Sequence, residues 1–200
     1  QARADAPDGF AGAARQAAAA HGFSLDDAQQ RALVPLERLY RELSRANQVR
    51  HPLLRLFGRR RPVRGLYLWG GVGRGKSFLM DAFFGDVPIA RKRRVHFHRF
   101  MQEVHQRLRD LQGEENPLSL VARSISADAR LLCLDEFQVT DIGDAMLMRN
   151  LLAGLFDCGV VLVTTSNLHP DQLYAHGLQR SQFLSAIALI LNDYLSRMTD

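Results

Sequence analysis

The chain has 200 residues, of which 46% are apolar and 24% are charged, and its formal net charge is +5. These values are ordinary for one soluble globular domain, or one domain with a short extension, that buries a sizeable core. The chain has no run of 18 apolar residues, which excludes a transmembrane helix, while Gln1 at its start leaves open a targeting segment that was removed.

Residues 1–60 have the pattern of an N-terminal helical extension. Residues 1–22 are rich in alanine and poor in large apolar side chains, which indicates a frayed helix or a disordered leader. Ser24–Asp27 then offers a helix cap with acids in the first turn. An amphipathic face at helical spacing follows, made of Leu33, Leu36, Leu39, Tyr40 and Leu43. Pro35 predicts a break or a helix start there. We expect this extension to pack on a core formed by residues 61–200.

A phosphate-loop pattern, Gly-x4-Gly-Lys-Ser, lies at Gly70–Ser77. The apolar run Gly65–Trp69 before it predicts a buried strand, and residues 77–84 after it predict a helix that Gly85 and Pro88 end. This arrangement binds phosphate through loop N–H groups and the helix dipole. Lys76 would contact the β- and γ-phosphates, and Ser77 would hold Mg²⁺. The sequence therefore predicts a nucleoside triphosphate site made of Gly70, Gly71, Val72, Gly73, Arg74, Gly75, Lys76, Ser77 and Phe78.

Strands and helices alternate from Gly65 onward. We expect further strands at 95–100, 131–134 and 160–164, and helices from about 142 to 156 and from 181 to 195. A helical stripe after the second strand is made of Phe100, Val104, Leu108 and Leu111. Continuous apolar strands separated by helices indicate a parallel sheet covered on both faces, so the predicted fold class is α/β.

Polar residues follow two of the predicted strands. The third strand ends in Asp135-Glu136. Asp135 fits the carboxylate that holds Mg²⁺ through water, opposite Ser77, and Glu136 is placed to activate a water for attack on the γ-phosphate. The fourth strand, expected beside the phosphate-loop strand, leads to Asn167, which can position that water. An ordinary loop residue or helix cap before Pro170 is the alternative interpretation of Asn167.

The order of these features narrows the class of protein. Along the chain come the phosphate loop, an intervening strand, a strand that ends in Asp-Glu and a strand that leads to Asn167. This order is the arrangement of the additional-strand ATPases. The Asn-Lys-x-Asp motif of GTPases and the Leu-Ser-Gly-Gly signature of ABC ATPases are both absent from the sequence. A nucleotide kinase is disfavoured, because the acid pair and Asn167 suit activation of water and no arginine-rich closing lid is evident.

Five segments together resemble the ZapE/AFG-like ATPases of the AAA+ superfamily. They are Gly71–Ser77, Val95–Met101, Leu134–Ile142, Thr165–Asn167 and Gly177–Arg180. The resemblance spans roughly residues 33–187 and implies a P-loop ATPase that assembles into a ring and acts on protein partners. Bacterial members are linked to cell division and the FtsZ ring, and mitochondrial members to quality control of respiratory-chain proteins.

The resemblance assigns roles residue by residue. Lys76 and Ser77 match Walker A, Asp135 and Glu136 match Walker B, Asn167 matches sensor 1, and Arg180 is the best match for the arginine finger. The family pattern continues after Ile187 with a further strand and a helical lid that carries a sensor-2 arginine. The chain stops at Asp200, so we expect it to be truncated before the lid.

Other conspicuous residues have simpler interpretations. We expect Cys133 and Cys158 to be buried, reduced thiols of an intracellular protein, and Met101, Met146 and Met148 to fill the core. His96 and His98 would share one face of a strand, where a structural or phosphate-proximal role is favoured over a metal site. The basic clusters Arg59–Arg61 and Arg91–Arg94 are expected in solvated loops flanking buried strands, although they would also suit a nucleic acid or an acidic partner.

The function that these observations predict is Mg²⁺-dependent ATP hydrolysis coupled to the remodelling or regulation of a partner protein. The resemblance places it in the bacterial cytoplasm, with a peripheral position at the inner membrane left open, in cell division. The expected partners are FtsZ or a membrane-associated division protein, in addition to other copies of the chain in a homo-oligomeric ring. The alternative is a DNA-associated loader or scaffold that uses ATP as a binding switch, which the arginine clusters and a sequence pI near 9.8 permit.

Overall fold

The computed structural model describes residues 9–48, 63–190 and 195–197, in which five strands form one parallel sheet. The strands are β1 (Gly65–Trp69), β2 (Lys92–His96), β3 (Leu131–Asp135), β4 (Val161–Ser166) and β5 (Leu195–Arg197). Their order across the sheet is β2-β3-β4-β1-β5, and every neighbouring pair is parallel. The predicted α/β class and the predicted pairing of the Asn-bearing strand β4 with β1 are confirmed. The carboxyl ends of β1, β3 and β4 therefore meet at one edge of the sheet.

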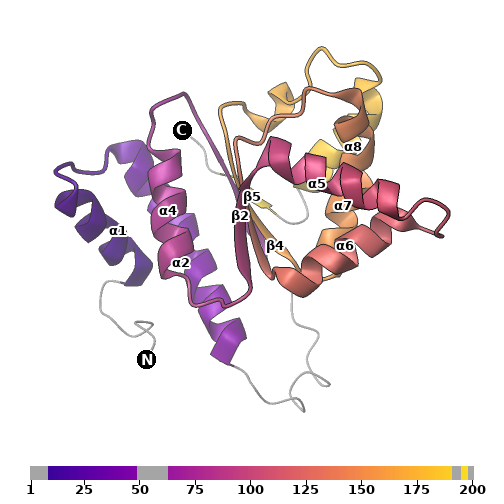
Figure 1. Ribbon diagram of the computed structural model, residues 1–200. Helices are drawn as coiled ribbons and strands as arrows, with labels where there is room; N and C mark the ends of the chain where they lie inside the picture. The colour runs from indigo at the N-terminus through magenta and orange to yellow at the C-terminus, as the bar shows by residue number, and fades with distance from the viewer. Residues whose placement is uncertain (1–8, 49–62, 191–194, 198–200) are drawn as a thin grey trace.

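Helices cover both faces of the sheet (Figure 1). One face carries α1 (Gly9–Ala20), α2 (Asp27–Gln48) and α4 (Lys76–Asp86), and the other carries α5 (Phe97–Asp110), α6 (Pro117–Asp128), α7 (Ile142–Asp157) and α8 (Arg180–Ala188). The 3₁₀ turn η2 (Pro170–Gln172) lies between β4 and α8. Strand side chains alternate between two buried clusters, because Leu66 and Val163 pack with the first set of helices and Tyr67 and Leu162 with the second. Within the described residues, no helix is both long and apolar enough to cross a membrane.

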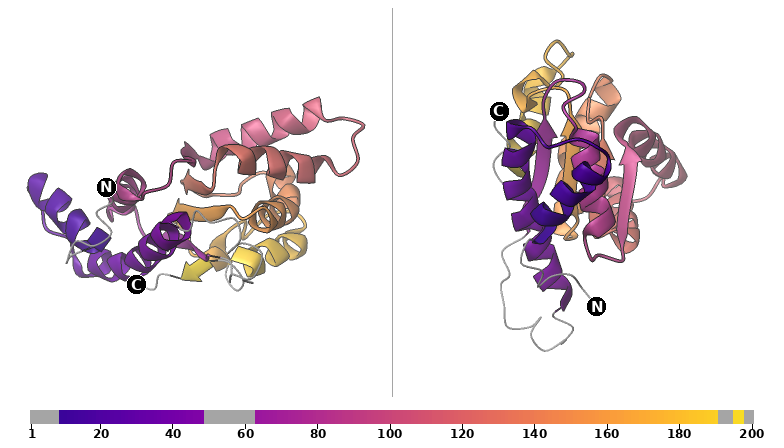
Figure 2. Two further views of the ribbon diagram at one scale, coloured as in Figure 1. Left: turned by 90° about the horizontal axis from the view of Figure 1, so that it is seen from below. Right: turned by 90° about the vertical axis from the view of Figure 1, so that its left-hand side faces the viewer.

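Of the two alternatives predicted for the leader, a helix is found at residues 9–20, which form α1, but this helix is packed on the core and not frayed. Phe10 is fully buried, stacks on Tyr40 at 5.9 Å between ring centroids, and meets Phe83 of α4 edge-on at 5.5 Å. Ala14 and Ala18 are also buried, and their small side chains let the α1 backbone lie close to α2. The right-hand view of Figure 2 shows both helices lying in front of the sheet. Their assignment to a separate extension at residues 1–60 stays a prediction.

The predicted break at Pro35 is also wrong, because α2 runs through this residue from Asp27 to Gln48. Proline removes one backbone N–H donor from a helix and strains the preceding turn. The apolar face of α2 compensates, since Leu33, Leu36 and Leu39 are each at most 1% exposed. Burial against α1 and α4 therefore outweighs the local preference of proline.

The second strand lies earlier than the sequence indicated. β2 is Lys92–His96, and α5 begins at Phe97. β2 is an edge strand whose side chains are half-buried or exposed, so charged residues are tolerated there and hide its signal. The buried residues Phe97, Phe100, Met101 and Val104 have helical spacing instead. His96 and His98 consequently do not share a strand face, contrary to the prediction.

The basic cluster Arg91–Arg94 does not lie in a solvated loop, so that prediction is wrong. Its side chains bond within the protein: Arg91 to the carbonyl oxygens of Ser126 and Ala127, Lys92 to those of Phe84 and Val87, and Arg93 to the Glu103 carboxylate. Arg94 bonds to the carboxylates of Asp81 and Asp135. The second cluster, Arg59–Arg61, lies outside the described residues.

Three further elements differ from the prediction. α4 extends past Gly85 to Asp86, and α6 was not predicted, although Val121, Ala122 and Ile125 bury one of its faces. The predicted helix at 181–195 is too long, because α8 ends at Ala188 and Leu195 begins β5. β5 pairs in parallel with β1, so a further strand of the core lies within this chain. The boundaries of β1, β3, β4 and α7 agree with the prediction to within two residues.

Candidate functional site

The phosphate loop connects β1 to α4, and its backbone leaves the first turn of that helix open. Gly75 precedes α4 in the left-handed conformation, with φ of 74°, and no side chain caps the helix N-terminus. Gly73 also has a left-handed φ, 78°, which glycine adopts without the strain of a side chain. The first N–H groups of α4 and the positive end of its dipole are thus available to an anion.

Lys76 lies in the first turn of α4 and reaches back over the loop. Its Nζ donates hydrogen bonds to the carbonyl oxygens of Gly70 and Gly71 at 2.8 and 2.7 Å. Burial lowers the pKa of Lys76, because removing the ammonium group from water disfavours its charged form. The ammonium group therefore lies against the loop, where phosphate binding requires a cation.

A cavity of about 370 Å³ joins the phosphate loop to the ends of β3 and β4. It is lined by Val72, Gly73, Arg74, Gly75, Lys76, Ser77, Glu136, Thr165, Ser166 and Asn167. The structure thus brings two predicted residues from distant parts of the sequence, Glu136 and Asn167, to the loop that carries Lys76 and Ser77. The order of the strands explains this, since β4 lies between β1 and β3.

Asp135 is the last residue of β3, next to Glu136, and its side chain is 10% exposed. Its Oδ2 accepts a hydrogen bond from Arg94 Nε at 2.6 Å, and its Oδ1 accepts one from Thr165 Oγ1 at 3.3 Å. Arg94 also pairs with Asp81 of α4. Sequence reasoning missed Arg94 and Thr165 as site residues, because both contacts depend on which strands are neighbours.

Glu136 has an unusual backbone next to the cavity. Its φ is 55°, a left-handed conformation that costs a non-glycine residue roughly 1 kcal/mol or more. Its N–H donates to Thr165 Oγ1 at 3.1 Å, which holds the turn, and its side chain is 77% exposed. Thr165 therefore links the backbone of Glu136 to the carboxylate of Asp135 through one hydroxyl group.

The His96 imidazole contacts the Glu136 carboxylate. Its Nδ1 lies 3.6 Å from Glu136 Oε2, and both side chains are mostly exposed. His98, the second residue of α5, instead contacts Gln102. In the described part of the chain, no three His, Cys, Asp or Glu side chains are grouped to hold a metal ion.

The turn that carries Asn167 is fixed by hydrogen bonds on both sides of it. Ser166 Oγ donates to the Phe137 carbonyl oxygen at 2.8 Å and accepts from Leu168 N–H at 3.1 Å. Tyr67 Oη donates to the Leu168 carbonyl oxygen at 2.9 Å. Burial raises the pKa of Tyr67, so its hydroxyl stays a donor throughout the physiological range. These bonds join β1 to the ends of β3 and β4, next to the cavity that Ser166 and Asn167 line.

Five predicted site residues do not line this cavity: Gly70, Gly71, Phe78, Asp135 and Arg180. Arg180 begins α8, and its Nη2 donates to the Asp171 carbonyl oxygen at 2.7 Å. Phe78 belongs to the first turn of α4, but its ring packs edge-on against Phe23, with the ring centroids 5.0 Å apart. The predicted role of Arg180 toward a neighbouring copy stays a prediction.

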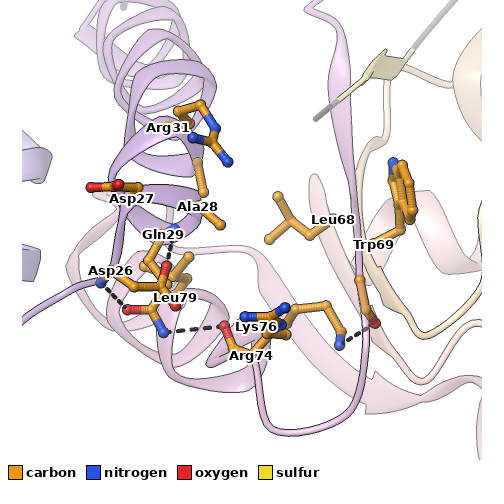
Figure 3. Close-up of a pocket in the computed structure, with 12 residues that line it drawn as sticks. Asp26, Asp27, Ala28, Gln29, Arg31, Leu68, Trp69, Arg74, Lys76 and Leu79 are labelled. Carbon is orange, nitrogen blue, oxygen red and sulfur yellow. Dashed lines mark hydrogen bonds between the residues drawn. The ribbon is translucent and has the colours of Figure 1, made fainter. Parts of the chain in front are cut away.

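A second cavity, of about 560 Å³, lies beside the phosphate loop between α2 and β1 (Figure 3). Its lining combines the apolar side chains of Leu68 and Leu79 with polar residues at the start of α2, including Asp26, Asp27 and Gln29. Lys76, Arg74 and Gly70 belong to its lining as well. Its size and mixed lining suit a small organic ligand that continues from the phosphate site.

Two predictions about core residues require correction. Cys133 is buried, and burial raises its pKa to about 12, but Cys158 is exposed at the end of α7. Met101 and Met148 fill the core as expected, whereas Met146 is 44% exposed. The exposed face of α7 also carries apolar residues, so the amino-acid composition of this helix does not show which of its residues are buried.

The fold and the cavity together define a class of protein. A phosphate loop between β1 and α4, with β4 inserted between β1 and the acid-bearing strand β3, makes this a P-loop NTPase fold of the AAA+ type. DnaA from Aquifex aeolicus, in a structure with bound AMPPCP, superposes with a TM-score of 0.60 over 89% of this chain and 49% of that chain. The two are 16% identical in sequence, a level that shows the shared fold alone.

Sequence comparison then identifies the family. The model of the AFG1-like ATPase family matches residues 12–195, and the chain belongs to this family. The cell division protein ZapE of Escherichia coli K12 is 48% identical over 177 residues, which cover 82% of this chain and 47% of ZapE. Lactation elevated protein 1 homolog B of Danio rerio is 44% identical over 144 residues, covering 66% of this chain and 28% of that protein. The chain thus spans about half the length of ZapE and less of the fish protein.

Proposed function

We propose that this chain binds ATP with Mg²⁺ and hydrolyses the bond between its β- and γ-phosphates. The observation that carries the proposal is the 370 Å³ cavity, in which a phosphate loop with its lysine meets Glu136 and Asn167. The loop has room for phosphate groups, because a Cβ placed on Gly71 or Gly73 would meet no atom within 4 Å. The uncapped start of α4 supplies N–H groups to the same space.

Each residue has a chemical role in this proposal. Lys76 would pair with the β- and γ-phosphates in place of the loop carbonyls that it now contacts. Ser77 and Asp135 offer the oxygen ligands that Mg²⁺ prefers, either directly or through water, and the ion supplies charge neutralisation on the phosphate oxygens when bound. Glu136 has an exposed carboxylate that can accept a proton from the attacking water, and the Asn167 amide can orient that water.

The nucleoside would occupy the second cavity. It adjoins the phosphate loop through Gly70, Arg74 and Lys76, and the side chains of Leu68 and Leu79 give an aromatic base an apolar surface. The first turn of α2 forms the opposite side of this cavity (Figure 3). The N-terminal helices would therefore contribute to the nucleotide site.

Two substitutions test the proposal. Lys76→Ala should abolish ATP binding measured by calorimetry, since the phosphates lose their fixed counter-ion. Glu136→Gln should leave binding nearly intact and lower phosphate release on the order of a hundredfold or more, because the amide cannot accept a proton. Unchanged ATP affinity in a folded Lys76→Ala variant would contradict the binding site. A parental rate of hydrolysis in Glu136→Gln would contradict the assignment of the base.

The cellular role that we infer is regulation or remodelling of a partner protein during bacterial cell division, in the cytoplasm. It is supported by the similarity to ZapE, which is named a cell division protein. FtsZ or a membrane-associated division protein stays the predicted partner. Assembly into a ring, with Arg180 of one copy reaching the phosphates of the next, is compatible with the position of Arg180 outside the cavity of its own chain.

The alternative of a DNA-associated loader receives no specific support from the described residues. The cluster Arg91–Arg94, which had suggested a nucleic-acid surface, makes its hydrogen bonds and ion pairs within the protein. Measuring DNA binding at increasing salt would test this alternative, because phosphate contacts produce a steep loss of affinity with salt.

A further inference from the structure

Gln29 connects the first turn of α2 to the phosphate loop (Figure 3). Its side-chain Nε2 donates to the carbonyl oxygen of Arg74 at 3.1 Å. Its Oε1 accepts from the N–H of Asp26 at 3.0 Å, and its own N–H donates to Asp26 Oδ1 at 2.8 Å. Because the carbonyl end of the Gln29 amide is held by a backbone N–H, the NH₂ end must face the loop.

The absence of a side chain at Gly75 lets Gln29 approach the loop closely. A Cβ on Gly75 would collide with the amide nitrogen of Gln29, whereas one on Gly71 or Gly73 would meet open space. The left-handed φ of 74° at Gly75 adds a second reason for glycine at this position. The side chain of Gln29 therefore packs directly on the Arg74–Gly75 peptide unit.

The geometry of that peptide unit determines what Gln29 can do. In a trans peptide the C=O of one residue and the N–H of the next point in opposite directions. Holding the Arg74 carbonyl toward α2 consequently directs the Gly75 N–H away from α2. Arg74 and Gly75 both line the 370 Å³ cavity, where loop N–H groups would meet phosphate oxygens.

We propose that Gln29 is a positioning residue for the phosphate loop. It fixes the Arg74–Gly75 peptide in the orientation that presents the Gly75 N–H to phosphate, and it couples that orientation to the N-terminal helices. This inference rests on the proposed nucleotide site. It predicts that Gln29 acts on the phosphate part of the ligand, even though its side chain also lines the larger cavity beside the loop.

The chain offers a matched set of variants. Gln29→Ala removes both side-chain bonds, and Gln29→Glu keeps the length and the acceptor for Asp26 N–H but loses the donor to Arg74. Gln30→Ala is the control, because this neighbouring side chain accepts from Arg15 Nε at 3.0 Å on another face of α2. Calorimetry would measure the affinity of each variant for Mg-ATP and for Mg-tripolyphosphate, which has no nucleoside.

The two Gln29 variants should lose roughly tenfold in affinity for both ligands, the scale of one hydrogen bond to a charged group. Gln30→Ala should match the parent. Where ATP turnover is measured, KM should rise in the Gln29 variants while kcat changes little, because binding is weakened equally in the ground and transition states. Rising Kd for ATP with unchanged Kd for tripolyphosphate would overturn the proposal, since Gln29 would then contact the base. Parental affinities in Gln29→Ala would overturn it as well.

A measurement without nucleotide separates this inference from the proposed function. If the parent chain fails to bind Mg-ATP, the proposed function fails, but amide hydrogen exchange of residues 70–76 still tests Gln29. Faster exchange in Gln29→Ala than in the parent and in Gln30→Ala supports the contact as the restraint on the loop. Equal exchange in all three proteins refutes that restraint.

Discussion

Arg94 provides a sharp test of how the candidate site is stabilised. It bonds to Asp135, whose side chain is 10% exposed, and to Asp81, whose side chain is 63% exposed. Replacing Arg94 by Met keeps much of its apolar stem and removes the cation from both carboxylates. Asp135 then stays nearly buried without the charge that offsets its lost hydration, while Asp81 can be solvated.

The expected size of the effect follows from these exposures. Removing one partner of a buried ion pair costs roughly 3–5 kcal/mol, and the 21% exposure of Arg94 favours the lower end, about 3 kcal/mol. For a protein of this size that is a fall in Tm of roughly 6–12 °C. Asp81→Asn, the matched control, should cost about 0–1 kcal/mol, because an exposed pair contributes little.

Thermal and urea unfolding followed by circular dichroism would measure these changes. A double variant, Arg94→Met with Asp135→Asn, should regain at least about half of the stability that Arg94→Met loses, since no buried charge is left unpaired. The reasoning is refuted if Arg94→Met unfolds within about 1 kcal/mol of the parent. It is equally refuted if the double variant is less stable than Arg94→Met alone.

Phe10→Ala should destabilise the protein by about 3–5 kcal/mol in urea unfolding, because it empties a fully buried aromatic site, and parental stability would show that α1 contributes nothing to the core. With a colorimetric thiol reagent, Cys158 should react rapidly in the folded protein, while Cys133, with a pKa raised to about 12, should react only on unfolding. A Cys158→Ser variant that keeps the rapid reaction would contradict this. In assemblies, mixing Arg180→Ala copies with Lys76→Ala copies should restore ATPase activity, because an intact Arg180 of one copy then meets an intact phosphate loop of another. An arginine supplied in trans can be worth about a thousandfold in rate. The absence of rescue would count against Arg180 as the arginine finger.

Local patterns were sufficient to predict the phosphate loop and the strand that leads into it. Gly70–Ser77 needs only a strand before it and a helix after it, and both are written in adjacent residues. The apolar run of β3 and the acids that close it were recognisable for the same reason. The sequence also predicted that Asn167 would lie near the loop, because the order of strands in such sheets is restricted.

Features that depend on tertiary contacts were not predictable in this way. Arg94 appeared as part of a solvated cluster, and only the register that pairs β2 with β3 places it beside Asp135. Phe10 was a single large apolar residue among alanines, and its burial depends on Tyr40 and Phe83, which lie 30 or more residues away. The continuous helix through Pro35 likewise depends on packing that outweighs a local preference.

The hydrogen bonds around Asn167 separate the position of this residue from its chemistry. Ser166 and Leu168 hold the turn on either side, and Tyr67, 101 residues from Leu168 along the chain, supports it from β1. Among the described residues, none of these bonds uses the Asn167 side chain. A series of substitutions at Asn167 to Ala, Ser and Asp would therefore vary one functional group at a fixed backbone position. Differences in rate across that series would measure the amide alone, without a contribution from loop rearrangement.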